Sequence, residues 1–234
     1  MKRRAKRAKP SPRLRAVQDS DSDSDDEDDN EVVRQGRDVY FYASVSPAST
    51  LKLAKLLDDA SREAVNADAP HVTLHIHSWG GCVFAGLAAF DQIRTNRVPV
   101  HTVACGFVAS AATLLLLAGH RRFCHPNSAI LIHQLSTGCD GKLHDILEEV
   151  RNSQVTMGMM HRVYEENTWL TSEQLNVMLR GETMLTYEKA CEHGFVEGPY
   201  APAQIRRAPP HAAGRGRADA ASQTPCNTHL RWKD

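Results

Sequence analysis

Hydrophobic and polar positions recur with two different periods through the middle of the chain, and these periods predict strands that alternate with helices. Residues 71–78 alternate strictly, because Val72, Leu74 and Ile76 are separated by polar residues. A period of two residues is typical of a strand with one face buried. In residues 82–94 the apolar positions instead recur at helical spacing, so this segment predicts an amphipathic helix after the strand.

The same pattern predicts a succession of similar units along the chain. We expect further strands at residues 38–45, 98–105 and 129–134. We expect further helices at residues 49–67, 110–119, 143–167, 171–180 and 187–194, and a turn-bearing connection at residues 120–127. Strands that alternate with helices indicate an α/β fold with a largely parallel sheet and right-handed crossovers. We therefore predict one folded domain at residues 37–198.

Composition adds two tails to this picture. The 234 residues are 41% hydrophobic and 24% charged, ordinary values for a globular protein with one sizeable core. Residues 1–36 are a basic run followed by an acidic run, and residues 199–234 are rich in Ala, Pro, Gly and Arg. Neither segment has the apolar residues that ordering requires, so we expect disorder at both ends. The basic run KRRAKRAK also fits a nuclear localisation signal.

Charge and cysteine content bear on the location and the partners. The formal net charge of +0 arises because the basic and acidic runs cancel, so it indicates neither a nucleic-acid nor a membrane partner. The six cysteines form no C-x-x-C pair and follow no signal peptide, which favours a reduced cytoplasmic protein, or a nuclear one if the basic run is a signal. No apolar run approaches the roughly 20 residues of a membrane-spanning helix. We expect no membrane and no nucleic-acid partner.

Ser110 stands where a predicted strand gives way to a predicted helix, in the stretch GFVASAATLLLLAG. Serine often begins a helix, so one interpretation is a simple helix cap. The other interpretation is a nucleophile, because the small residues Ala109 and Ala111 leave room for a sharp turn. The N–H of Ala111 would then face whatever the hydroxyl attacks. The surrounding residues do not form the G-x-S-x-G elbow of α/β-hydrolases.

The turn HSWGGCV is a second candidate element, in which Gly80 and Gly81 join a predicted strand to a predicted helix. Glycines permit a tight turn and let backbone N–H groups approach a ligand or an oxyanion. Such turns are also common in proteins that have no catalytic site. The chain contains neither G-x-G-x-x-G at this turn nor G-x-x-x-x-G-K-[ST], and we expect no cofactor.

His133 ends a predicted strand and would serve as general base for Ser110 if a carboxylate oriented its ring. Glu182 is the first candidate for that carboxylate, with Asp140 and Glu188 as alternatives. A histidine at the end of a strand is more often simply a hydrogen-bonded residue, so this position alone does not decide the matter.

His75 and His77 share one face of a predicted strand, and their spacing would also suit two metal ligands. No third ligand is evident from the sequence. A half-exposed sheet face explains both histidines, so we predict no metal site.

Taken in order, three stretches of the chain resemble the Clp protease proteolytic subunit. They are LHIHSWGGCVFAGLAAFDQI, VACGFVASAATLLLLAGHRRFCHPNSAILIHQ and TMLTYEKACEHGFVEG. The family has a turn like NSPGGSV, a serine in AASM, the segment RFCLPNSRVMIHQP, and a carboxylate before LSAPEAVEYGLVD. The resemblance covers essentially the whole predicted domain, and RFCHPNSAILIHQ is its most specific part.

The resemblance implies a role for five residues. Ser110 matches the nucleophile, His133 the general base and Glu182 the third member of the triad, while the N–H groups of Gly81 and Ala111 match the oxyanion hole. It implies a serine endopeptidase that acts on peptides and unfolded proteins, built from stacked βαβ units with a protruding helical handle. It further implies two stacked heptameric rings of this chain, fed by an ATP-dependent AAA+ unfoldase.

Several features depart from the family pattern. Glu182 replaces an aspartate, Trp79 replaces a proline in the turn, and Ala111 replaces a methionine after the serine. The extra methylene of Glu182 requires its backbone to lie further from His133, and the bulk of Trp79 would narrow a substrate cleft. The loop AGHRRFC is shorter than usual, and the N-terminal axial-pore segment of the family has no clear match. This last difference puts unfoldase docking in question.

Three alternatives stay open from the sequence. The first is a catalytically weak or inactive ClpP-like subunit with a structural or regulatory role in the ring. The second is an acyl-CoA enzyme of the related crotonase fold, which also uses paired backbone N–H groups. The third is a self-contained peptidase with the same βαβ core, such as a capsid-maturation or signal-peptide peptidase.

Overall fold

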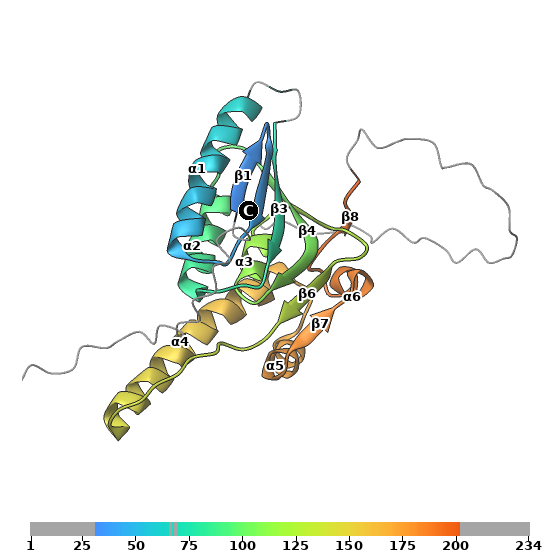
Figure 1. Ribbon diagram of the computed structural model, residues 1–234. Coiled ribbons are helices and arrows are strands. Elements are labelled where there is room, and N and C mark those ends of the chain that lie inside the picture. The colour runs from blue at the N-terminus through green and yellow to red at the C-terminus, as the bar shows by residue number, and fades with distance from the viewer. Residues whose placement is uncertain (1–30, 66, 68–69, 202–234) are drawn as a thin grey trace, which may run out of the picture.

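The structure, a computed structural model, describes residues 31–201 apart from residues 66, 68 and 69. The two predicted tails lie outside the described residues, except for a few residues at the inner end of each. The described chain forms a sheet of eight strands with helices packed around it (Figure 1). Strands and helices alternate through most of the chain, so the predicted α/β fold is confirmed.

The sheet has the strand order β1-β2-β3-β4-β5-β8, and β6 and β7 continue it from β4. The pairs β1–β2 and β6–β7 are antiparallel, whereas the other five pairs are parallel, as the succession of strands and helices predicts. The strands are β1 (Glu31–Gln35), β2 (Asp38–Tyr42), β3 (Val72–Ser78), β4 (Val100–Ala109), β5 (Arg121–Cys124), β6 (Ala129–Ile132), β7 (Thr183–Leu185) and β8 (Gly198–Pro199).

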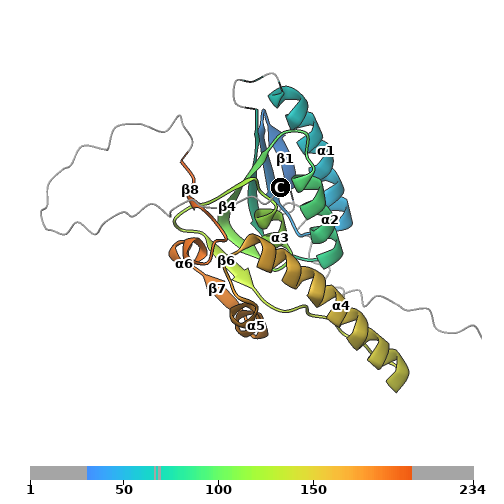
Figure 2. The same ribbon diagram turned by 180° about the vertical axis from the view of Figure 1, so that it is seen from behind.

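Helices α1, α2 and α3 lie together on one face of the sheet, whereas α4 projects from the body (Figure 2). This projecting helix is the handle that the family resemblance predicts. The helices are α1 (Pro47–Ala64), α2 (Val83–Arg94), α3 (Ala112–Leu117), α4 (Leu143–Asn167), α5 (Ser172–Arg180) and α6 (Tyr187–Glu192).

Helix packing follows directly from the hydrophobic pattern. Ser46 caps the start of α1, since its hydroxyl accepts a hydrogen bond from the Ser49 N–H. The helix buries Leu53 and Leu57 in the core. α3 is buried on all sides, which explains why its residues have no polar face. Each fully buried leucine contributes about 2 kcal/mol to stability. α3 therefore forms a rigid base for the residue that precedes it, Ser110.

The strand β4 changes partner halfway along its length. Its first half pairs with β5, and its last three residues, Phe107 to Ala109, pair with β6. Gly106 lies at the change with φ +68°, and a Cβ there would come within 2.9 Å of His77 Nδ1. A residue with a side chain would be strained at this point. The change of partner carries the end of β4, and with it Ser110, to the edge of β6.

Four strands lie where none was predicted, namely β1, β5, β7 and β8. β1 falls in the predicted tail, and its Val32 is buried in the core, so the folded region reaches back at least to Glu31 rather than starting at residue 37. β5 lies within the predicted connection at residues 120–127. The sequence of β5 does not look like a buried strand because it contains Arg121 and Arg122. Arg122 is nevertheless buried, and it donates a hydrogen bond to the Asn167 carbonyl.

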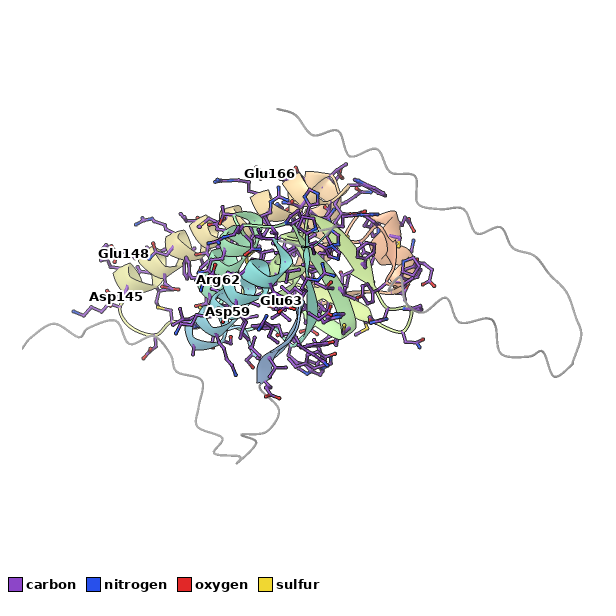
Figure 3. All side chains as sticks on the ribbon, turned by 90° about the horizontal axis from the view of Figure 1, so that it is seen from above. Asp59, Arg62, Glu63, Asp145, Glu148 and Glu166 are labelled. Atoms are coloured by element: carbon purple, nitrogen blue, oxygen red, sulfur yellow. The ribbon has the colours of Figure 1, made fainter. Side chains whose placement is uncertain are left out.

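Charged side chains cover the outer surface of the helices. Figure 3 shows Asp59, Arg62 and Glu63 on α1, and Glu148 and Glu166 on α4, all of them exposed. Within the described part of the chain, no helix combines the length and the apolar character that crossing a membrane requires.

Candidate active site

Ser110 occupies a strained position between β4 and α3. Its φ is +54°, the left-handed region, and no other residue besides glycine has a positive φ in the described part of the chain. Such a conformation costs of order 1 kcal/mol or more for a residue with a side chain, and it occurs most often at functional sites. It directs the chain sharply from the strand into the helix.

Hydrogen bonds hold this turn on both sides. The Ser110 N–H donates to the Leu131 carbonyl on β6 at 2.9 Å, and the Ser110 carbonyl accepts from the Thr113 hydroxyl at 2.6 Å. Thr113 Oγ1 lies 2.6 Å from the hydroxyl of Tyr164 on α4. Tyr164 is fully buried, and burial raises its pKa to about 12. The backbone of Ser110 is thus fixed by β6, α3 and α4 together.

The Ser110 side chain does not cap α3. The residue at the N-cap position is Ala111, and no side chain makes a capping hydrogen bond there. The interpretation of Ser110 as a simple helix cap is therefore wrong. Its hydroxyl instead lines a pocket of about 630 Å³.

The Gly80–Gly81 turn packs directly against Ser110. Val45 brackets this turn, because its N–H donates to the Gly80 carbonyl and its carbonyl accepts from the Cys82 N–H, both at 2.7 Å. The N–H of Gly81 takes no part in this pair, and Gly81 lines the same pocket as Ser110. Backbone N–H groups in this position suit the binding of a developing oxyanion.

Neither glycine of this turn has space for a side chain. A Cβ on Gly80 would lie 2.7 Å from Ser110 Cβ and 2.8 Å from the Ala109 carbonyl oxygen. A Cβ on Gly81 would overlap the carbonyl oxygen of Val45. Both residues also have positive φ values, +98° for Gly80 and +141° for Gly81. The glycines that the sequence singles out are thus required by the packing of the turn.

Replacing Gly80 by alanine should therefore destabilise the protein by about 3 kcal/mol, from the clash with Ser110 and the strained backbone. Chemical denaturation of both proteins measures this change. Gly158→Ala is the control, because no atom lies within 4 Å of a Cβ added there and alanine favours a helix interior. A Gly80→Ala protein as stable as the Gly158→Ala protein would contradict the packing described here.

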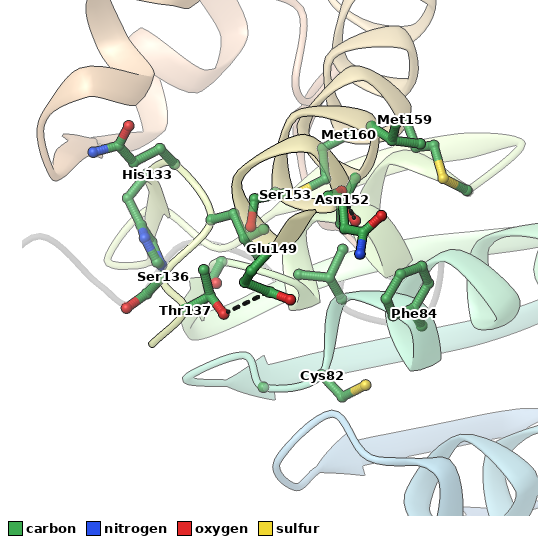
Figure 4. Close-up of a pocket in the computed structure, with 17 residues that line it drawn as sticks. Cys82, Phe84, His133, Ser136, Thr137, Glu149, Asn152, Ser153, Met159 and Met160 are labelled. Carbon is green, nitrogen blue, oxygen red and sulfur yellow. Dashed lines mark hydrogen bonds between the residues drawn. The ribbon is translucent and has the colours of Figure 1, made fainter. Parts of the chain in front are cut away.

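His133 follows β6 and lines the same pocket as Ser110 (Figure 4). Leu131 on β6 pairs with Ala109 on β4, so the two parallel strands end side by side with Ser110 and His133 just beyond them. The carboxyl ends of parallel strands are the usual place for an active site in an α/β fold. The structure thus brings the predicted nucleophile and the predicted base to one pocket.

The pairing of β7 with β6 brings Glu182 close to His133. It is exposed and immediately precedes β7, whose Thr183 pairs with Ile132 of β6 in an antiparallel register. Continuing that register by one residue places Glu182 opposite His133. Directly opposed residues of an antiparallel pair extend their side chains on the same face. No hydrogen bond joins Ser110, His133 and Glu182 to one another in the described structure, and Glu182 does not line the pocket.

The alternative carboxylates are placed less favourably. Asp140 is exposed and lies shortly before α4, at the end of the handle that projects from the body. Glu188 is exposed on α6 and accepts a hydrogen bond from the Thr186 hydroxyl at 2.8 Å, which lowers its pKa. Neither residue has the register relation to His133 that Glu182 has.

Two further sequence expectations concern residues near the site. Trp79 does not line the pocket, since its side chain is 76% exposed and its ring centroid lies 4.5 Å from that of Phe107. Trp79 therefore does not narrow this pocket. Ala111 is fully buried at the start of α3, next to the Gly80 turn.

The two histidines of β3 interact with other parts of the sheet. His75 Nε2 lies 3.2 Å from Asp38 Oδ1, and its Nδ1 lies 3.8 Å from Cys105 Sγ. Burial lowers the pKa of His75, which favours the neutral form of its ring. The Phe107 N–H donates to His77 Nδ1 at 3.2 Å. Among the residues that the structure describes, no group of three or more side chains is arranged to hold a metal ion.

Sequence reasoning did not identify the residues of α4 that complete the pocket. Their signal is a polar stripe at helical spacing within an otherwise mixed helix. The polar residues that α4 contributes are Glu149, Asn152, Ser153 and Thr156. Without a fold to place α4 beside Ser110, the sequence alone does not distinguish this stripe from an ordinary solvated face.

Comparison with known protein families matches residues 31–199 to one of them, Clp protease. The chain belongs to the Clp protease family. The match begins where β1 begins and ends where β8 ends, so it covers the whole described fold. The resemblance predicted from the sequence is confirmed. Membership supports a serine-type peptidase rather than an acyl-CoA enzyme. Members of the Clp protease family generally form oligomeric rings that work with unfoldases.

Proposed function

We propose that this Clp protease family member is an active serine endopeptidase, with Ser110 as nucleophile, His133 as general base and Glu182 as the carboxylate that orients His133. The observation that carries the proposal is the strained backbone of Ser110 at the wall of a pocket that His133 also lines. Such a strained backbone costs folding free energy, and residues in strained conformations cluster at active sites.

Acyl transfer would proceed in two halves. His133 takes the proton from Ser110 Oγ as this oxygen attacks the carbonyl carbon of the scissile bond. The N–H groups of Gly81 and Ala111 donate to the resulting oxyanion, and His133 then gives the proton to the leaving amine. Water activated by His133 hydrolyses the acyl-enzyme and restores Ser110. Glu182 holds the ring in the required tautomer and offsets the imidazolium charge.

We also infer that the chain assembles through its handle. α4 exposes four apolar side chains at helical spacing, and this face has no partner within the described part of the chain. They are Leu143, Ile146, Leu147 and Val150. An exposed apolar stripe on a projecting helix is typical of an oligomer contact. The stripe supports an assembly of several copies of this chain through α4. We propose that the assembly is two stacked heptameric rings that admit unfolded substrates, with an AAA+ unfoldase as partner.

The proposed location is the cytoplasm, or the nucleus if the basic N-terminal run is a signal. None of the five cysteines of the described residues forms a disulfide, which supports a reducing compartment.

A catalytically weak ring subunit is the second candidate. The observation that favours it is the absence of hydrogen bonds among Ser110, His133 and Glu182 in the described structure. Catalytic hydrogen bonds are often formed only when substrate is bound, so this observation ranks below the placement of Ser110.

Labelling with a fluorophosphonate separates the two candidates. The full-length protein should be modified once, with the adduct mapped by mass spectrometry to Ser110, and a His133→Ala protein should lose the label because its hydroxyl is no longer activated. Ser136→Ala is the matched control, since Ser136 lines the same pocket and should not affect labelling. A folded, assembled protein without label would favour the inactive subunit.

A further inference from the structure

α4 contributes both polar and apolar residues to the candidate catalytic pocket, and the polar ones form a stripe along the helix. Glu149, Asn152, Ser153 and Thr156 follow one another by three, one and three residues, so they lie on one face of the helix. In Figure 4 Glu149 faces Thr137, and Asn152 and Ser153 lie on the same helix above Glu149. A pocket built for an apolar side chain does not require this stripe.

The hydroxyl of Ser153 is independent evidence that the pocket binds a hydrogen-bond donor. Its hydroxyl oxygen is buried and has no hydrogen-bond partner, and it is the only side-chain oxygen or nitrogen in that state among the described residues. Buried polar groups in folded proteins are almost always paired, because leaving one unpaired costs about 1–3 kcal/mol. A donor on a bound side chain would satisfy the Ser153 oxygen.

The charge of the pocket indicates which donor fits. Among the described residues that line the pocket, Glu149 is the only aspartate or glutamate, and none is a lysine or an arginine. Glu149 is partly buried and accepts a hydrogen bond from the Thr137 hydroxyl at 3.3 Å, and it forms no ion pair within the described chain. A single carboxylate in a partly enclosed site favours a cationic guest.

The pocket also has apolar lining residues. Leu135, Val155 and Met159 border the same pocket. Glu149 and Thr156 are separated by seven residues of helix, about 10 Å along its axis. A long side chain with an apolar stem and a charged end matches such a channel, as lysine and arginine do.

We propose that this pocket selects a lysine or arginine side chain next to the scissile bond, with Glu149 binding its charge and the Ser153 hydroxyl accepting one of its N–H groups. This inference rests on the proposed peptidase function, because it names the substrate class of the same site. Arginine gains most, since its planar guanidinium binds a carboxylate in two places.

The test uses fluorogenic peptides that differ at one position, which is arginine, lysine, leucine or the neutral arginine isostere citrulline. The assembled full-length enzyme should show a kcat/KM for arginine at least about tenfold above that for citrulline, as expected for a charge-assisted hydrogen bond. Glu149→Gln should abolish this ratio, which is the readout because it compares two peptides on the same enzyme. Glu148→Gln is the control, because Glu148 lies next along α4 but outside the pocket and should keep the ratio.

Ser153→Ala supplies a second, independent readout. It removes a buried unpaired oxygen, so the protein should unfold at an equal or higher temperature while the arginine-to-citrulline ratio falls. A merely structural serine would not lower the ratio without lowering stability.

The outcomes separate the two levels of the proposal. Cleavage without preference for arginine or lysine, in a protein whose Ser110 is labelled, overturns the basic-residue specificity and leaves the peptidase function standing. A ratio that survives Glu149→Gln overturns the role of Glu149. Failure to label Ser110 and to cleave any of the four peptides overturns the peptidase function and the specificity with it.

Discussion

Replacing Ser110 by alanine should lower the kcat for peptide hydrolysis by a factor on the order of 10⁶, the loss typical for removal of a serine nucleophile. The fold should survive, because the hydrogen bonds that hold Ser110 use its backbone N–H and carbonyl. Alanine and serine also share the cost of a φ of +54°. Steady-state hydrolysis of a fluorogenic peptide measures the change.

A second variant separates chemistry from folding at this position. Ser110→Gly should be as inactive as Ser110→Ala, but more stable towards denaturant by about 1 kcal/mol, because glycine adopts the left-handed conformation without strain. Ser136→Ala should retain nearly full activity, although it removes a hydroxyl from the same pocket. Activity in Ser110→Ala within tenfold of the wild type would exclude Ser110 as the nucleophile.

The alternation of strands and helices could be predicted from the sequence because its cause is local. The apolar residues of β3 repeat every second position, and those of α2 repeat at helical spacing. β5 could not be predicted in this way, since its pairing with β4 and β8 stabilises a strand that contains two arginines. The burial of Arg122 depends on the Asn167 carbonyl, which lies forty-five residues further along the chain.

In the candidate site, too, the features with a local cause could be predicted and those that depend on tertiary contacts could not. Ser110 and the two glycines stand at predicted junctions, where small residues are a local sign of a tight turn. The positive φ of Ser110 has no such sign, because it follows from contacts with β6 and α4. The pocket wall on α4 also depends on where the handle leaves the body. Substrate specificity is therefore the hardest property of this site to predict from sequence patterns alone.

The role of Glu182 depends on the register between β6 and β7, which places it opposite His133. Glu182→Gln should lower kcat by about 10⁴-fold with little change in KM, because a neutral amide favours the wrong tautomer of His133 and does not offset its charge. Glu182→Asp should retain more activity than Glu182→Gln because it keeps the carboxylate, but less than the wild type because its side chain is one methylene shorter. Peptide hydrolysis with separate kcat and KM values measures both changes.

Glu188→Gln is the matched control, because Glu188 is an exposed carboxylate close by on α6 whose hydrogen bond is local to that helix. It should leave kcat unchanged. Glu182 is exposed at the start of β7, so its substitution should not alter stability by more than about 0.5 kcal/mol, and a loss of kcat would report on His133 alone. If Glu182→Gln keeps kcat within tenfold, the antiparallel register of β6 and β7 does not deliver the third triad member, and His133 acts without a carboxylate.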